Sequence, residues 1–179
     1  MRAARLRLTA ADVSQAGDAI VGHWKAQPEL ARARRVGIYA ALPAELPTRP
    51  LFEHLRSRGC EVLLPRCAEE RLRFAAVVRW ADLVPGPYGV LEPPAHFVEV
   101  PPAGEDPVLV PGLAFDRGGH RLGQGQGWYD RSFSERDAQR LIGAGFALQV
   151  VEAVPCDTWD RRVGSILTER GFTRVTRTS

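Results

Sequence analysis

The chain of 179 residues contains no long apolar run. A helix that spans a bilayer needs about 20 consecutive apolar residues, so we expect no membrane partner. Residues 1–11 carry arginines but no apolar stretch, which argues against a secretory signal. Lysine is almost absent, because Lys25 is the only lysine among 24 basic residues. No basic block and no stripe of basic and aromatic residues occurs, so nucleic acid is not an expected partner either.

Cysteine is also scarce, with single residues at positions 60, 67 and 156. Their number is odd and no pair has metal-ligand or redox spacing, so we expect reduced thiols in a cytoplasmic protein. The chain is 45% hydrophobic and 25% charged, which is typical of a globular protein. We find no repeat and no linker. We therefore expect residues 1–179 to form a single domain, and the protein to be a monomer.

Short apolar segments alternate with amphipathic ones along the chain. Thr9 and Asp12 form a candidate capping box for a helix that reaches Trp24. Further helices are expected at 48–58 and 129–142. Strands are expected at 36–40, 61–64 (ended by Pro65), 72–78, 108–110, 146–151, 165–168 and 172–176, and a long surface connection at 84–102. This alternation predicts an α/β fold, with a mainly parallel sheet and helices on both faces.

The glycine-rich stretch 112–127 carries most of the chemical information. Gly123, Gly125 and Gly127 alternate directly before an expected helix. Glycines let backbone N–H groups approach an anion, and a helix N-terminus adds further donors. Arg121 can add a charge-assisted bond, so the stretch predicts a phosphate cradle. The spacing matches neither a Walker A loop nor a Rossmann fingerprint, and a tight turn that only joins a strand to a helix is the alternative.

Two aspartates flank this stretch. Asp130 falls in the first turn of the expected helix. It either complements the helix dipole or serves as a Mg²⁺ ligand beside the phosphates. Asp116 follows an expected strand, where an Asx turn explains it well.

The segment 110–131, VPGLAFDRGGHRLGQGQGWYDR, closely resembles the signature of the 5-formyltetrahydrofolate cyclo-ligase family. Shorter stretches agree in order, including IYAALPAE at 38–45, VLLPR at 62–66 and YGVLEP at 88–93. The resemblance extends from about residue 8 to residue 169. It implies a three-layer α/β fold and an ATP- and Mg²⁺-dependent conversion of 5-formyltetrahydrofolate to 5,10-methenyltetrahydrofolate. ADP and phosphate would be released, and a phosphorylated formyl (imidate) group would be the intermediate.

The resemblance also implies roles for single residues. Those expected to bind ATP are Arg121, Leu122, Gly123, Gln124, Gly125, Gln126, Gly127, Trp128 and Tyr129, with Arg121 and Gln126 as catalytic residues. Those expected to bind the folate are Ala40, Glu45, Gln124, Gly125, Gln126, Gly127 and Trp128. Asp130 and Asp160 would hold Mg²⁺. A carboxylate at Glu45 suits the donor groups of a pterin, although without the resemblance Glu45 and Asp160 would both be interpreted as solvated acids.

Two features depart from the family pattern. The family commonly has a lysine where this chain has Gln126, and a glutamine supplies no charge. Family members also usually open with a basic Lys-x-x-Leu-Arg segment that touches ATP. In this sequence Met1 lies too close to the turn at 8–12 for that segment, and the cations that could substitute are Arg2, Arg5 and Arg7. The alternative is therefore a nucleotide- or folate-binding relative with little or no turnover.

Overall fold

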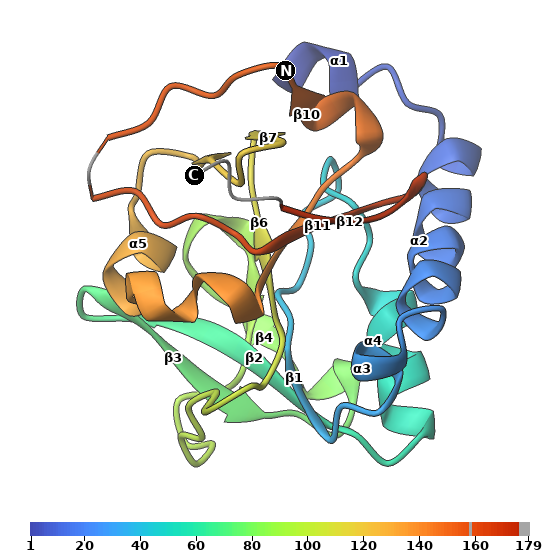
Figure 1. The fold of residues 1–179 in the computed structure, drawn as a ribbon. Coiled ribbons are helices and arrows are strands. Elements are labelled where there is room, and N and C mark those ends of the chain that lie inside the picture. The colour runs from blue at the N-terminus through green and yellow to red at the C-terminus, as the bar shows by residue number, and fades with distance from the viewer. Residues whose placement is uncertain (158, 176–179) are drawn as a thin grey trace.

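The computed structural model describes residues 1–157 and 159–175, without the side chain of Arg2. Its largest element is a seven-stranded sheet with the order β12-β11-β9-β6-β1-β2-β3 (Figure 1). The strands are β1 (Arg35–Gly37), β2 (Glu61–Ala68), β3 (Arg71–Ala76), β6 (Val108–Pro111), β9 (Leu141–Ala144), β11 (Ser165–Thr168) and β12 (Gly171–Arg174). The inner strands pair in parallel, and β3 and β12 run antiparallel at the two edges. The predicted α/β fold with a mainly parallel sheet is confirmed.

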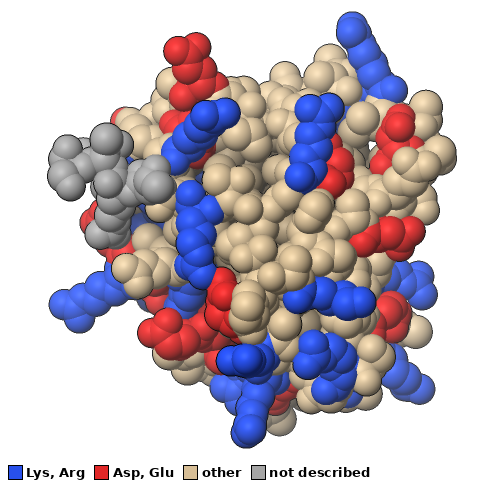
Figure 2. All heavy atoms as spheres, turned by 45° about the vertical axis from the view of Figure 1, so that its right-hand side comes forward, with Lys and Arg blue, Asp and Glu red and all other residues tan. Residues whose placement is uncertain are grey.

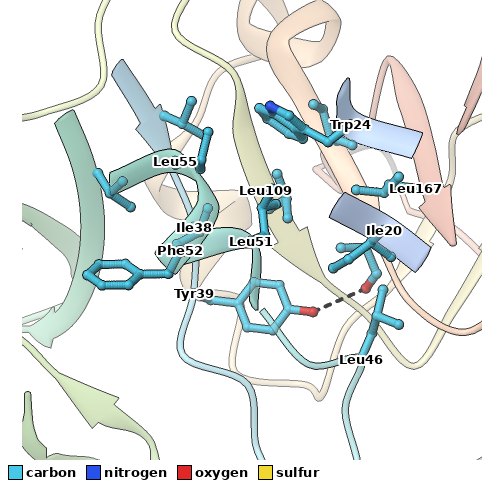
Figure 3. Close-up of a cluster of buried hydrophobic side chains, with 14 of the residues drawn as sticks. Ile20, Trp24, Ile38, Tyr39, Leu46, Leu51, Phe52, Leu55, Leu109 and Leu167 are labelled. Carbon is cyan, nitrogen blue, oxygen red and sulfur yellow. Dashed lines mark hydrogen bonds between the residues drawn. The ribbon is translucent and has the colours of Figure 1, made fainter. Parts of the chain in front are cut away.

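Helices cover one face of this sheet (Figure 1). They are α2 (Ala10–Lys25), α3 (Pro28–Ala31) and α4 (Arg49–Ser57), and the short α1 (Arg2–Arg5) precedes them. The side chains of Ile20, Trp24 and Phe52 pack against alternate strand residues, which are Val36, Ile38, Val62, Leu64, Leu109, Ile142 and Leu167. Figure 3 shows this cluster, and in it the Tyr39 hydroxyl donates to the Ala144 carbonyl at 3.4 Å. The first capping box is present as predicted, since Thr9 and Asp12 bond reciprocally.

The opposite face of the large sheet is covered by short helices together with a small second sheet. Helix α5 (Trp128–Ser132) and the 3₁₀ helix η3 (Glu135–Arg140) lie there with a three-stranded sheet of β10 (Val150–Val151), β7 (Ala114–Asp116) and β8 (Arg121–Leu122). On this second face, the other alternate residues of the sheet strands pack around Phe115 and Phe133. They include Leu63, Val108, Val110, Leu141 and Ile166. The alternation of side chains along each buried strand thus supplies both halves of the core.

The expected helix at 129–142 is wrong beyond its first turn. Helix α5 ends at Ser132, and a second capping box between Ser134 and Asp137 starts η3. Residues Leu141–Ala144 form β9, an inner strand between β11 and β6. A short apolar run that is buried on both faces has no distinguishing period, so it can be mistaken for the end of a helix. The expected strand at 146–151 is wrong over its first part, because Ala147–Gln149 form the 3₁₀ helix η4, and only Val150–Val151 belong to a strand, the short β10.

Pro65 does not end the second strand, contrary to our prediction. Strand β2 continues to Ala68, and Pro65 stays in register opposite Phe74 of β3. Strand β1 pairs with β2 only as far as Leu63. A proline is tolerated where a strand has a free side, because no ladder hydrogen bond is lost.

The remaining segments agree more closely with expectation. The connection at 84–102 contains the 3₁₀ helix η2 (Pro87–Gly89) and a hairpin of β4 (Val84–Pro85) with β5 (Leu91–Glu92), and the 3₁₀ helix η1 (Trp80–Asp82) precedes it. The last expected strand corresponds to β12, and Thr176 lies outside the described residues. In the described part of the chain, no helix is long and apolar enough to cross a membrane. Basic and acidic side chains are interspersed over the face shown in Figure 2.

Candidate active site

A cleft of about 1390 Å³ opens beyond the carboxyl ends of β1, β2 and β6. Ligands of open α/β sheets commonly bind at this edge. All residues predicted to contact ATP, folate or Mg²⁺ line this one cleft: Ala40, Glu45, Arg121, Leu122, Gly123, Gln124, Gly125, Gln126, Gly127, Trp128, Tyr129, Asp130 and Asp160. Residues that are far apart in the sequence are thus brought together, while their individual ligands remain predictions.

The glycine loop requires its glycines for different reasons. Gly125 and Gly127 have φ values of +87° and +63°, in the left-handed region that favours glycine. Gly123 leaves little room for a side chain, because a Cβ atom there would lie 3.0 Å from Nη1 of Arg121 and the guanidinium would have to shift. Gly127 is also the N-cap of α5, which has only five residues. A phosphate cradle at this place would therefore depend on loop N–H groups more than on the long helix that we expected.

Arg121 is bonded within the protein. Its side chain is 6% exposed, and Nη2 donates to both carboxylate oxygens of Asp130 at 2.8 Å. Nη1 donates to the Pro111 carbonyl at 3.3 Å, and the guanidinium lies 5.6 Å from the ring centroid of Tyr129. The predicted phosphate ligand and the predicted metal ligand thus form an ion pair with each other.

The two predicted metal ligands belong to one wall of the cleft. Oδ1 of Asp130 also accepts from the backbone amide of Arg161, which directly follows Asp160. The Asp160 carboxylate accepts from the Asp157 amide at 2.8 Å. Among the described residues, no group of three or more His, Cys, Asp or Glu side chains could hold a metal ion.

Glu45 is buried rather than solvated, which excludes the solvated-acid interpretation for this residue. Its side chain accepts from the Leu42 amide at 3.0 Å and from Nε2 of Gln124 at 3.1 Å. Burial raises the pKa of the Glu45 carboxyl, against the opposing effects of the Leu42 amide, the Arg5 charge and Gln124. The bond to Gln124 joins the glycine loop directly to the segment that follows β1.

Gln126 contacts the opposite side of the cleft. Its Oε1 lies 3.5 Å from the hydroxyl of Tyr88, a residue with φ of +60°. The neighbouring Trp128 lies under the Arg131 guanidinium at 5.2 Å. Position 126, where the family commonly has a cation, is thus occupied by a neutral side chain that bridges two loops.

The amino-terminal arginines differ in environment. Arg5 is buried, and its Nε has no hydrogen-bond partner in the described part of the chain. Its charge is close enough to lower the pKa of Glu45. Arg7 is exposed, and the side chain of Arg2 lies outside the described atoms. Of the two substitutes whose side chains are described, Arg5 is the one that acts on a residue of the cleft.

Sequence reasoning assigned no role to several residues of the cleft. Glu92 is buried, accepts from the Cys67 amide at 3.2 Å, and has a pKa raised by burial. Trp159 is 64% exposed and lines the cleft beside Asp160. The YGVLEP stretch already contained Glu92, but no periodicity indicates that a carboxylate on a proline-rich connection turns inward.

The family model described as the 5-formyltetrahydrofolate cyclo-ligase family matches residues 1–169 of the chain. The chain belongs to this family. It is 30% identical to the 5-formyltetrahydrofolate cyclo-ligase of Haemophilus influenzae over 173 residues, which cover 93% of this chain and 92% of that protein. It is 29% identical to the 5-formyltetrahydrofolate cyclo-ligase of Escherichia coli K12 over 174 residues, which cover 94% of this chain and 96% of that protein.

Solved structures agree with this family. The NMR structure of Aquifex aeolicus 5,10-methenyltetrahydrofolate synthetase is 28% identical, with a TM-score of 0.81 over 99% of this chain and 90% of that one. The synthetase of Mycoplasma pneumoniae, which is 18% identical, shares the fold with a TM-score of 0.71 over 94% of this chain and 93% of that one. The resemblance inferred from the cyclo-ligase signature is confirmed, and the chain is a member of an enzyme family.

Proposed function

We propose that the chain catalyses the ATP- and Mg²⁺-dependent cyclisation of 5-formyltetrahydrofolate to 5,10-methenyltetrahydrofolate, with release of ADP and phosphate. One observation carries the proposal within the family. Gln124 of the glycine loop bonds to Glu45, so the expected phosphate cradle and the expected pterin contact lie side by side in one cleft. A reaction between ATP and a folate requires this adjacency.

The proposed reaction has two steps. The formyl oxygen of the folate attacks the γ-phosphorus of ATP, the bond to ADP breaks, and a formyl (imidate) phosphate forms. N10 of the folate then attacks the formyl carbon. The bond between this carbon and the phosphate oxygen breaks, phosphate leaves with the electron pair, and N10 loses its proton. Phosphoryl transfer depends mainly on positioning and charge neutralisation, so loop N–H groups and a buried arginine suit it.

The residues of the cleft would divide the binding of the pterin, the phosphates and the transferred group among them. Glu45 would orient the pterin through its donor groups, and the N–H groups of residues 123–127 would hold the phosphates. Arg121 and Gln126 would face the transferred group. The cleft walls would exclude water, which would otherwise compete with N10 for the activated carbon.

The donor set fits Mg²⁺. This cation prefers oxygen ligands and is usually held by one or two carboxylates together with substrate phosphates. Asp130, with a side chain that is 18% exposed, and Asp160 are carboxylates on one wall of the cleft. They would hold the cation, which would neutralise phosphate charge when bound.

The deciding experiment is a cyclo-ligase assay with 5-formyltetrahydrofolate, ATP and Mg²⁺, in which the absorbance of methenyltetrahydrofolate is followed. We expect turnover that stops when either ATP or Mg²⁺ is omitted. Binding of ATP and folate without turnover would favour the alternative, a binding relative of the family. Turnover without ATP would contradict the proposal.

We also propose a monomeric cytoplasmic protein that acts on small molecules, without nucleic acid or membrane partners. The cysteines at positions 60, 67 and 156 are free, as is typical of proteins in reducing compartments. Size-exclusion chromatography with light scattering would test the monomer.

A further inference from the structure

The ion pair between Arg121 and Asp130 joins two groups that the proposed function assigns to different ligands. Both side chains line the cleft, and both are largely shielded from water. Nη2 of Arg121 is shared between the two oxygens of Asp130, while Nη1 bonds to the Pro111 carbonyl. The Asp130 carboxylate therefore occupies one of the two terminal nitrogens through which Arg121 could bind a phosphate oxygen.

We propose that Asp130 is a specificity-determining residue, which makes the cleft discriminate against free triphosphate and in favour of the metal-complexed nucleotide. The inference rests on the proposed function, because it concerns the same nucleotide site. It adds a role that a metal ligand alone does not have: Asp130 holds Arg121 away from phosphate until a cation takes over the carboxylate.

Two physical effects lead to this result. A metal-free triphosphate must compete with a carboxylate that is already bonded to Arg121 in a poorly solvated position, where charge-assisted bonds are strong. It must also approach the negative charge of Asp130, with only partial screening by salt. A cation that binds Asp130 removes both obstacles, because it neutralises the carboxylate and releases Nη2 for the phosphate.

Titration calorimetry on the full chain tests the proposal with ATP in excess EDTA and, separately, in Mg²⁺. Asp130→Asn should tighten metal-free ATP about tenfold, which corresponds to about 1.4 kcal/mol. The same variant should weaken the binding of ATP in Mg²⁺. Asp160→Asn is the matched control, because it removes the same charge from the same wall, while among the described residues the Asp160 carboxylate accepts from the Asp157 amide and not from Arg121. It should change metal-free affinity by no more than about twofold.

A second variant identifies the group that Asp130 restrains. In the double variant Asp130→Asn with Arg121→Met, the gain in metal-free affinity should disappear, and the neutral pair avoids leaving a buried charge unpaired. Inorganic tripolyphosphate should follow the same order as ATP, because the adenosine takes no part in the argument. Thermal melting of each variant verifies that it is folded.

Several results would overturn the inference. If Asp130→Asn and Asp160→Asn tightened the binding of metal-free ATP equally, general charge repulsion would explain the effect and Asp130 would have no specific role. Weaker metal-free binding in Asp130→Asn would mean that Asp130 only aligns Arg121, and a gain retained in the double variant would exclude Arg121. A wild-type chain that turns over folate but shows no gain in Asp130→Asn would contradict this inference alone. Failure of all forms to bind ATP would contradict the proposed function as well.

Discussion

Glu45 illustrates what a single residue contributes to the site. It is a buried carboxylate held by the Leu42 amide and by Gln124, with Tyr39, Tyr129 and the Arg5 charge nearby. Burial raises its pKa above the ordinary value of about 4.5, so the folded state binds a proton more readily than the unfolded state. Ionised Glu45 therefore costs stability, and that cost appears as the pH rises through the raised pKa.

The same shift predicts a pH dependence of folate binding. A pterin needs the ionised carboxylate as an acceptor, so KM for the folate should rise as the pH falls through the raised pKa of Glu45. This rise should begin at a higher pH than for an ordinary glutamate. KM measured between pH 8 and pH 5 checks the prediction. In Glu45→Gln the KM should be high and independent of pH over this range, and an unchanged pH profile in that variant would assign the titration to another group.

Gln126 gives the second prediction at the residue scale. Gln126→Lys should raise kcat/KM about tenfold, because a preorganised cation stabilises developing charge on the transferred phosphoryl group. The Tyr88 contact of Gln126 would be lost in the variant, so Tyr88→Phe is the control for loss of that bond alone. A fall in kcat/KM for Gln126→Lys, beyond that for Tyr88→Phe, would mean that the site is built around a neutral donor.

The packing of Phe115 is the clearest feature at the scale of elements. Its ring, which projects from β7, lies against three glycines: Gly112 after β6, Gly143 within β9 and Gly145 after it. A Cβ atom on Gly143 would lie 2.5 Å from Cε1 of that ring. Strands β6 and β9 thus contact β7 of the three-stranded sheet through the Phe115 ring, at a surface that leaves no room for an added methyl group.

This packing predicts opposite effects for one substitution at two positions. Gly143→Ala should lower the free energy of unfolding by about 1–3 kcal/mol, the usual cost of overpacking a core. Gly22→Ala in α2 should raise it by about 0.5–1 kcal/mol, because nothing lies within 4 Å of the new Cβ and alanine favours the helix. Urea denaturation of both variants measures the two values. A Gly143→Ala protein as stable as the wild type would show that Phe115 has room to move.

The accuracy of the sequence predictions also varied between elements. Helix α2 was predicted well because its capping box and amphipathic spacing are local signals. Strand β9 was missed because LIGA is buried on both faces, so its state depends on neighbours that are distant in sequence. The members of the cleft were predictable from one long motif and shorter matching stretches. The Arg121–Asp130 bond was not, because it depends on how the loop folds back onto α5.

At the scale of the whole molecule, the three thiols differ in burial, and we expect them to differ in reactivity. Burial raises the pKa of Cys60 to about 11 and that of Cys67 to about 12, whereas Cys156 is exposed. Because the thiolate is the nucleophile, a disulfide reagent at pH 7.5 should modify one thiol rapidly in the folded protein and all three in denaturant. The spectrophotometric titration should lose its fast phase in Cys156→Ser. A fast phase that survives there would show that Cys60 or Cys67 is accessible through local opening.

The order of the strands has a consequence for synthesis on the ribosome. Strand β6, which leads into the glycine loop, pairs with β1 on one side and with the later β9 on the other. A nascent chain that has emerged only through β8 would carry β6 with an unpaired edge, which is a template for association with other chains. Asp130 likewise receives its Arg161 amide only after a further 31 residues of the chain have been made. A ligand that binds at Asp130 could therefore stabilise this part of the nascent chain only after residue 161 has emerged.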